Sequence, residues 1–299
     1  MPKSYIVDDD YHEVRLDRWF KQKVINLPHS LIERIIRQNK IKLNKKRTKS
    51  SQRLQTGDLI EVFDISKFKA NNNDKKIKYI PQTKELSKYD DYVVENNENF
   101  IIINKPAGIP VQSGTKSFKN ITDVLKNSKY FKDSKPFIVH RIDKETSGIL
   151  IIAKNRKYAQ LFTALFRIRK IHKTYLALAY GKINKSVKCI RDDLTYFENK
   201  KKITQKAISN IKIIKSNDEI SFIELNPITG RKHQLRKQLL NLGNPIIGDD
   251  KYFLTNFRRI KTRNLMLHAY KIKFMINNVQ YNFKAKYNNY FEQLLKEKF

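Results

Sequence analysis

Apolar residues recur at helical spacing in two stretches near the N-terminus. In the first stretch, Leu16, Trp19, Phe20 and Val24 are spaced to share one face of a helix. A break at 27–29 ends this pattern. In the second stretch Ser30 is the expected N-cap, because Glu33 occupies the capping-box position three residues later. The apolar face of this second helix consists of Leu31, Ile32, Ile35 and Ile36.

Short alternating segments follow these helices. Residues 41–44 and 59–62 alternate as strands do, and the second segment comes directly after Gly57-Asp58. The two helices and the strands together predict a small N-terminal α/β unit over residues 12–64. Residues 65–90 are polar and irregular, and they predict a linker.

A second unit is expected over residues 91–299, where strand and helix patterns mix. The predicted strands are 91–94, 100–104, 137–140, 148–153, 173–179, 221–224 and 267–274. The predicted helices are 121–130, 155–169, 232–242 and 288–298. Because this order lacks a strict strand-helix-strand rhythm, it predicts an α+β fold with a mixed, largely antiparallel central sheet flanked by helices.

Charge narrows the possible partners. The chain carries 62 Lys and Arg against 29 Asp and Glu, a formal net charge of +33. Such an excess repels itself unless a polyanion is near, so nucleic acid is the first expected partner and an anionic membrane surface the second. Compositional bias can explain part of the lysine excess, but not the placement of arginine. No apolar run approaches a membrane span of roughly 18 residues, and the N-terminus lacks a signal-peptide pattern, so we expect a cytoplasmic protein.

The small unit concentrates this charge. Residues 30–53 contain nine basic side chains and one acidic one, Glu33, which predicts a surface of one sign. The helix-helix-strand pattern resembles the RNA-binding domain first described in ribosomal protein S-four, and that resemblance implies RNA contacts here. A solvated basic face on an accessory domain is the alternative. The side chains expected to contact RNA are Arg34, Arg37, Lys45, Lys46 and Arg47.

The strongest chemical signal is the string 140–150, His-Arg-Ile-Asp-Lys-Glu-Thr-Ser-Gly-Ile-Leu. It places Asp143 in a polar loop between apolar strands, with Arg141 and Lys144 on either side. A nearby cation favours an ionised carboxylate, which a nucleophile or general base requires. An isolated loop aspartate is more often a turn residue or a salt-bridge partner, so the loop alone does not decide the role.

The string resembles the signature of the RluA/RluC/RluD family of RNA pseudouridine synthases. Further matching segments occur in the family's order: 104–111 (Asn-Lys-Pro-Ala-Gly-Ile-Pro-Val), 171–177 (Ile-His-Lys-Thr-Tyr-Leu-Ala), 230–236 (Gly-Arg-Lys-His-Gln-Leu-Arg) and 267–269 (Leu-His-Ala). Within the family the N-terminal pattern is closest to the RluC type. Departures occur at Lys232 and at Lys237-Gln238, and they bear on fine RNA contacts alone.

The resemblance implies a pseudouridine synthase fold and assigns roles residue by residue. Asp143 matches the essential aspartate, Tyr175 the tyrosine that packs on the target base, and Arg236 the arginine that pairs with the carboxylate. Arg141 matches the arginine that fills the space left by the flipped uridine. Pocket positions with less defined roles are Lys173 and Leu267. Taken without the family, Tyr175 would be expected in the core and Arg236 on the surface.

The implied reaction needs no cofactor, since a glycosidic bond is moved from N1 to C5 of uracil without redox change. The sequence shows no phosphate-binding glycine loop, no HExxH and a single cysteine, so no cofactor or metal is expected. The predicted partner is 23S ribosomal RNA or its precursor, bound by a monomer with no membrane and no cofactor protein involved. Other RluD-type rRNA sites, tRNA, or a non-catalytic role in ribosome assembly are the alternatives.

A kinase-type catalytic loop is excluded, because Ile142 separates Arg141 from Asp143 and no glycine-rich loop is present. The histidines at 140, 233 and 268 each lie in or beside apolar runs, so we expect structural hydrogen-bonding groups.

Overall fold

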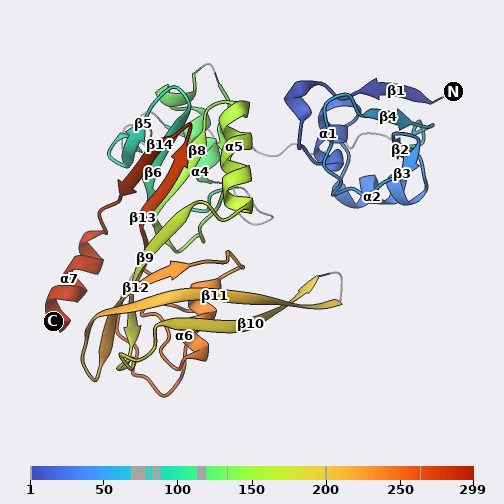
Figure 1. Ribbon diagram of the computed structural model, residues 1–299. Coiled ribbons are helices and arrows are strands. Elements are labelled where there is room, and N and C mark those ends of the chain that lie inside the picture. The colour runs from blue at the N-terminus through green and yellow to red at the C-terminus, as the bar shows by residue number, and fades with distance from the viewer. Residues whose placement is uncertain are drawn as a thin grey trace. The chain divides into compact units, whose positions relative to one another are not determined.

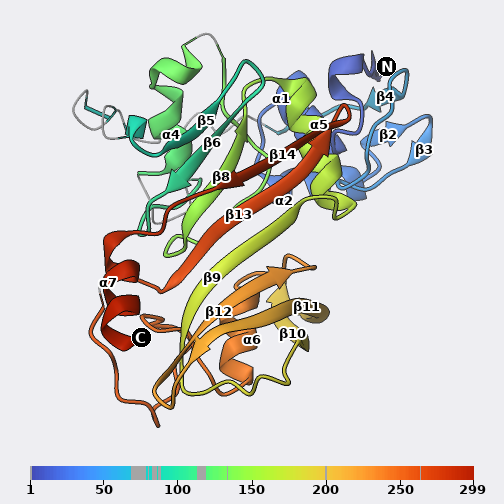
Figure 2. The ribbon, with the colours of Figure 1, turned by 60° about the vertical axis from the view of Figure 1, so that its left-hand side comes forward.

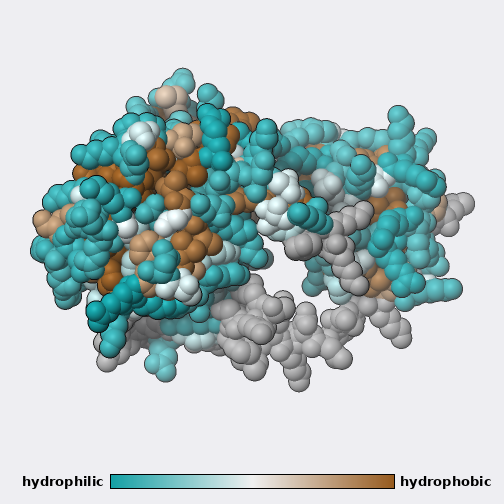
Figure 3. Space-filling view, turned by 90° about the horizontal axis from the view of Figure 1, so that it is seen from below, coloured by the Kyte–Doolittle hydropathy of each residue, from teal (hydrophilic) through white to brown (hydrophobic). Residues whose placement is uncertain are grey.

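The computed structural model describes residues 2–68, 79, 81–82, 86, 89–112, 119–132, 134–198, 201–262 and 264–299. It divides into two compact units, residues 1–77 and residues 78–299. Figure 1 shows a small blue unit of short elements and a larger unit built on one long, twisted sheet. In Figure 3 hydrophilic side chains cover most of the visible face of each unit, with hydrophobic patches between them.

The N-terminal unit packs two helices on a four-stranded sheet of order β1-β4-β2-β3. Its elements are β1 (Lys3–Ile6), η1 (Asp9–Tyr11), α1 (Leu16–Lys23), α2 (His29–Arg37), β2 (Ile41–Leu43), β3 (Lys46–Arg47) and β4 (Leu59–Val62). The apolar faces expected of both helices lie in its core, where Trp19 and Phe20 are fully buried. The unit extends beyond the expected 12–64, since β1 precedes it and Ile65 and Phe68 pack on its core. Most of the expected linker lies outside the described residues.

One local prediction in this unit is wrong. Helix α2 begins at His29 with Pro28 as its N-cap, and no side chain caps it. Pro28 already holds the extended conformation that an N-cap requires, so Ser30 falls inside the first turn. The Glu33 carboxylate instead accepts a hydrogen bond from the Ser50 hydroxyl, at 3.1 Å.

The larger unit is an α+β structure whose central sheet is mixed and largely antiparallel, as expected. The strand order is β10-β11-β12-β9-β13-β8-β6-β5, with β14 on β13 and β7 on β8. Only the β13–β8 pairing is parallel among the described strands. The strands are β5 (Val93–Asn96), β6 (Phe100–Lys105), β7 (Phe137–Ile138), β8 (Ser147–Ala153), β9 (His172–Tyr180), β10 (Cys189–Glu198), β11 (Lys201–Ser216), β12 (Ile220–Pro227), β13 (Leu267–Ile276) and β14 (Val279–Lys284).

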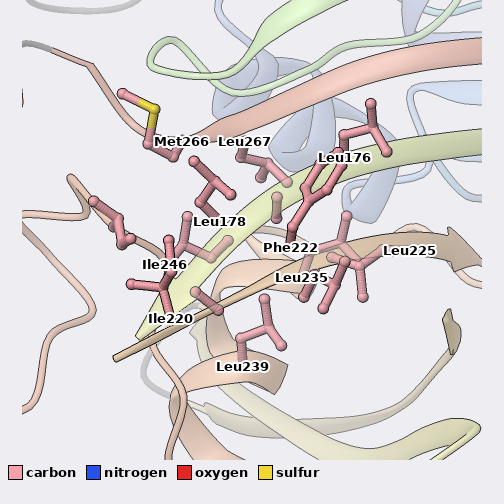
Figure 4. Close-up of a cluster of buried hydrophobic side chains, with 14 of the residues drawn as sticks. Leu176, Leu178, Ile220, Phe222, Leu225, Leu235, Leu239, Ile246, Met266 and Leu267 are labelled. Carbon is pink, nitrogen blue, oxygen red and sulfur yellow. The ribbon is translucent and has the colours of Figure 1, made fainter. Parts of the chain in front are cut away.

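Helices pack on both faces of this sheet. They are α4 (Ile121–Lys126), α5 (Arg156–Arg167), α6 (Gln234–Asn241) and α7 (Asn289–Lys298), with η2 (Lys129–Phe131) after α4. On one face Phe162 of α5 packs edge-on against Phe100 and Phe274. Figure 4 shows Leu235 and Leu239 of α6 directed at the apolar side chains of β9 and β12. Helix α6 is therefore held in place by its buried apolar side chains.

One glycine sets the spacing of the central strands. Gly148 of β8 lies directly opposite Ala269 of β13 and has a φ of +109°. A Cβ at this position would come within 2.8 Å of three backbone atoms of Ala269. Only glycine permits both this backbone conformation and this approach. The close contact fixes β8, and therefore the loop before it, against β13.

Candidate active site

A cavity of about 430 Å³ opens in the larger unit at the loop that precedes β8. Its lining comes from this loop, the end of α5, β9, residues 227–236 and the start of β13. All six side chains expected in a pocket line it: Arg141, Asp143, Lys173, Tyr175, Arg236 and Leu267. Segments almost 130 residues apart in the sequence therefore meet at one cavity.

The loop holds Asp143 partly exposed, with buried residues before and after it in the loop. Ile142 and Thr146 are buried, and the Thr146 backbone N–H donates to the Asp143 carbonyl oxygen at 3.2 Å. The Asp143 side chain is 24% exposed, so its carboxylate can reach a ligand in the cavity. Lys144, the cation next to it in sequence, pairs instead with Glu145, at 3.5 Å.

The cation beside Asp143 is Arg236 of α6. Its Nη1 atom lies 3.6 Å from Asp143 Oδ2. Its Nε and Nη2 atoms both donate to the Asp249 carboxylate, each at 2.7 Å. Asp249 has a fully buried side chain and also accepts the backbone N–H groups of Lys251 and Tyr252. This two-bond pairing fixes the guanidinium plane and leaves Nη1 directed at Asp143.

Burial opposes the positive charge of Arg236, but Asp249 and then Asp143 outweigh burial and raise its pKa. The guanidinium also lies over the Tyr252 ring, 5.0 Å from its centroid. The cavity therefore contains a permanent cation whose position is set by groups outside the cavity. Sequence reasoning did not identify Asp249 or Tyr252 as part of this arrangement.

His233 is a second neighbour of Asp143 that sequence reasoning placed among the structural histidines. Its Nε2 atom lies 3.8 Å from Asp143 Oδ1, and its Nδ1 atom is 2.9 Å from the Tyr252 hydroxyl. The residue has a φ of +54°, so α6 begins at Gln234 and not at 232 as expected. Burial lowers the pKa of His233, and the Asp143 carboxylate opposes this shift. A strained, partly buried histidine beside a carboxylate is typical of functional sites.

Strand β9 supplies the opposite wall. Burial, and then the negative charge of Asp143, raise the pKa of the Tyr175 hydroxyl, so it stays protonated near neutral pH. Burial also lowers the pKa of Lys173. An aromatic ring and the apolar Leu267 side chain thus face a carboxylate across the cavity. This combination can bind a flat base and hold it beside a charged group.

The cavity is strongly basic. Asp143 is the one acidic side chain among its described lining residues. The basic side chains are Arg141, Arg167, Arg169, Lys173, Arg231 and Arg236. Within the described part of the chain, no three His, Cys, Asp or Glu side chains are grouped to hold a metal ion. A polyanionic ligand fits this charge distribution, and its phosphates can contact the rim.

A buried lysine ties a second loop to the catalytic loop. The Nζ atom of Lys105 donates to the carbonyl oxygens of Pro106, Ile109 and Lys144, at 2.8, 2.9 and 3.0 Å. Burial lowers the pKa of Lys105 to about 7, and the charges of Glu145 and Asp143 oppose the shift. Three carbonyl acceptors match the three N–H bonds of a protonated amine, so the geometry favours the charged form. Lys105 thereby anchors the residue next to Asp143.

Gln238, one of the sequence departures, is fully buried in the core under α6, so the expectation that it bears on RNA contacts is wrong. Its amide oxygen accepts from the Ser209 hydroxyl at 2.6 Å, and its amide nitrogen donates to the Ile190 and Ala207 carbonyls. Gln234 also donates to Ser209, at 2.9 Å. These bonds hold α6, and therefore Arg236, on the β10–β11 hairpin.

The other two histidines are structural, as expected. His140 accepts the Ile151 backbone N–H through Nε2 at 2.8 Å, and burial lowers its pKa to about 3. The buried His268 ring lies 2.9 Å from the Ser147 hydroxyl and 3.1 Å from the Ala285 carbonyl, and burial lowers its pKa to about 4. Both rings are neutral near neutral pH, so their bonds brace the loop and β8.

The N-terminal unit displays the five cations expected to contact RNA. Arg34, Arg37, Lys45, Lys46 and Arg47 are all exposed. Asn44 and Lys45 both have positive φ values, at the turn between β2 and β3. Arg53, counted in the same basic cluster, instead donates to the Glu13 carbonyl and stabilises the unit.

Comparisons with known proteins agree with this geometry. The family model described as RNA pseudouridylate synthase matches residues 99–241. The ribosomal large subunit pseudouridine synthase C of Rickettsia conorii is 37% identical over 251 residues, covering 80% of this chain and 82% of that protein. The enzyme of the same name from Vibrio parahaemolyticus is 29% identical and covers 90% of this chain and 87% of its own length.

A solved structure extends the agreement to the fold. Human RNA Pseudouridylate Synthase Domain Containing 4 matches with a TM-score of 0.61 and 26% sequence identity. The match covers 71% of this chain and 94% of the human one. The chain is therefore an RluC-like member of the RluA/RluC/RluD family of RNA pseudouridine synthases.

Proposed function

We propose that this enzyme converts uridines to pseudouridine in large-subunit (23S) ribosomal RNA, with Asp143 as the catalytic carboxylate. The observation that carries the proposal is the placement of Asp143 beside Arg236 in a basic cavity that faces Tyr175. The two relatives described above are named for activity on the large ribosomal subunit, which supports the same substrate class here.

In the proposed reaction the target uridine leaves its helix and enters the cavity. The C1′–N1 bond breaks, the uracil turns while bound, and a C1′–C5 bond forms. The proton on C5 is then lost and N1 gains one, so product and substrate have the same composition. Asp143 acts on the ribose C1′, on the base, or by assisting a glycal intermediate.

Each neighbour has a separate part in this proposal. Arg236 keeps a positive charge at the carboxylate, and Tyr175 packs on the uracil and can relay a proton. Arg141, which is exposed at the cavity rim, fills the place that the base has left. Extruding a base costs a few kcal/mol, and phosphate contacts from the basic rim can offset that cost.

The N-terminal unit is proposed to bind RNA as an S-four-type domain. Its exposed cations on α2 and at the β2–β3 turn are the proposed contacts. We further propose that the enzyme acts in the cytoplasm as a monomer. No helix in the described part of the chain is long and apolar enough to cross a membrane.

Pseudouridine mapping in a strain that lacks the gene tests the substrate. The expected result is loss of pseudouridine at one or more positions of 23S rRNA, restored by the wild-type gene and not by Asp143→Asn. An unchanged 23S rRNA map with altered tRNA would replace rRNA by tRNA as the substrate. Unchanged maps in both RNAs would contradict the proposed activity.

A further inference from the structure

A row of lysines crosses the side of the central sheet that faces away from the cavity. We propose that Lys271, Lys273 and Lys284 bind a second stretch of RNA phosphate backbone, so that the RNA contacts both sides of this sheet. The inference rests on the proposed function, because it concerns the same RNA substrate.

Alternation along β13 determines which side these lysines occupy. Ile272 and Phe274 are buried, and Phe274 packs against Phe162 of α5. Lys173, which lines the cavity, pairs in register with Ile272, so the cavity and α5 lie on the same side. Lys271 and Lys273 alternate with the buried pair and therefore point to the other side.

The register of β14 adds a third cation. Lys284 lies directly opposite Lys271 in the antiparallel β13–β14 pair. Like charges directly opposite each other destabilise a sheet unless a counter-charge is present. Lys273 stands two residues along the same strand, with the exposed His172 opposite it. The three lysines therefore repel one another in this part of the sheet, directly after the bulge between Ala269 and Lys271.

Desolvation is the largest cause that lowers the pKa of Lys271, followed by the charges of Lys273 and Lys284, and the charge of Glu224 partly opposes the shift. Glu224 is the one acidic residue in β9, β12, β13 and β14. Its carboxylate accepts from Asn226 at 3.0 Å, and it lies opposite Lys212 in register. Among the described residues, none of the three lysines forms an ion pair. A ligand with closely spaced negative charges would relieve this repulsion.

This part of the sheet is open. Figure 2 shows the middle of β13, β14 and β9 without a helix drawn in front of it, and α7 lies to one side. Met275, on the same side as the two lysines of β13, is 55% exposed. An RNA backbone, with one phosphate per nucleotide, matches a row of cations along neighbouring strands better than a compact anion does.

The test is binding of in vitro transcribed 23S rRNA across a salt series. The triple variant Lys271→Gln, Lys273→Gln and Lys284→Gln is expected to bind about tenfold more weakly at roughly 0.15 M salt, with its log-log salt slope reduced by roughly 2 to 3. The matched control removes three exposed lysines elsewhere in the same unit, Lys126, Lys157 and Lys185. It is expected to change affinity by less than about twofold.

A second variant separates charge from fold. Replacing all three lysines by arginine keeps the charges and is expected to keep wild-type affinity, whereas the triple Gln variant is expected to show a raised melting temperature without RNA. Equal affinity losses in the triple Gln variant and in its control would overturn the inference. Loss of binding to anionic phosphatidylglycerol vesicles with unchanged RNA binding would overturn it in favour of a membrane surface. Because affinity is measured without turnover, failure of the catalytic proposal remains a separate result.

Discussion

The cavity and the N-terminal unit use positive charge in different ways. In the cavity, Arg236 is buried and donates two hydrogen bonds to Asp249. Its remaining guanidinium nitrogen, Nη1, faces Asp143. In the N-terminal unit, Arg34, Arg37 and the 45–47 cations extend into solvent. The first arrangement fixes one cation at one place, and the second provides many interchangeable contacts.

This difference separates reaction rate from affinity. A buried charge with several partners cannot be changed without disturbing those partners. Exposed cations that neutralise phosphates each contribute a similar, salt-dependent increment to the free energy of RNA binding. We therefore expect single substitutions in the cavity to change turnover strongly, and substitutions in the N-terminal unit to change binding by small steps.

The largest effect is expected for Asp143→Asn. The amide retains the shape of the side chain but cannot act as nucleophile or base, so pseudouridine formation should fall below detection while RNA affinity stays within about twofold of wild type. Nucleoside analysis of digested RNA and anisotropy binding measure the two quantities. The control is Glu145→Gln, which removes a carboxylate two residues away and should leave turnover largely intact. Persistent product with Asp143→Asn would contradict the assignment.

A smaller but still large effect is expected for Asp249→Asn. The substitution removes the charge that fixes the Arg236 guanidinium, and a misplaced group of this kind costs about 10²-fold in rate. Steady-state turnover of 23S rRNA should show the loss in kcat, with KM little changed. Asp250→Asn is the matched control, because its side chain is 94% exposed and pairs only with Arg259 among the described residues. Equal rates for both variants would show that the Arg236 position does not matter.

Acid should unfold the catalytic unit before the N-terminal one. In the folded chain His140 and His268 have pKa values of about 3 and about 4, below the ordinary value near 6.5. The unfolded chain therefore binds more protons between about pH 6.5 and 4, and stability is lost as the pH falls through that range. Each histidine contributes up to about 1.4 kcal/mol per pH unit.

Two probes separate the units in this experiment. The single tryptophan, Trp19, is buried in the N-terminal unit, so its fluorescence follows that unit. Far-UV circular dichroism is dominated by the larger unit. Urea midpoints at pH 7 and pH 5 should fall more by circular dichroism than by fluorescence. Equal shifts with both probes would refute the role of His140 and His268.

The smallest effect is expected in the N-terminal unit. Lys45→Gln with Lys46→Gln should weaken 23S rRNA binding about threefold to tenfold and reduce the log-log salt slope by roughly 1 to 2. Turnover at saturating RNA should stay at the wild-type value. The control is Lys3→Gln with Lys67→Gln, two exposed lysines of the same unit away from α2 and the β2–β3 turn. An identical loss in the control would mean that net charge, and not this surface, carries the contacts.

Much of the fold could be predicted because alternation and helical spacing mark elements with one buried face. All the strands and helices expected in the larger unit are present, with ends shifted by a few residues. The long β10–β11 hairpin was not expected, because a polar residue, Ser209, occupies a buried inward position and interrupts the alternation. Strand β14 was also not predicted, although Val279, Tyr281 and Phe283 alternate there with polar residues, so its sequence does carry the strand signal.

Only those cavity residues that belong to short family motifs could be predicted from the sequence. The family strings pointed to Asp143, Tyr175 and Arg236, but nothing local indicated that Asp249 would hold Arg236 from 13 residues away. The contact of His233 with Asp143 depends on a left-handed backbone at His233, which residue type alone does not predict for a non-glycine position. Such long-range pairs are set by tertiary packing.

Tritium release from 23S rRNA labelled with [5-³H]uridine reports the proposed bond exchange itself, because the C5 proton is lost only when C5 becomes the glycosidic carbon. The measurement compares wild type with Asp143→Asn, each in excess over RNA so that a single turnover is followed. We predict release by the wild-type enzyme and none by the variant, although both bind the RNA. Release by both proteins, or by neither while both bind, would contradict the proposal that Asp143 isomerises uridine in this RNA.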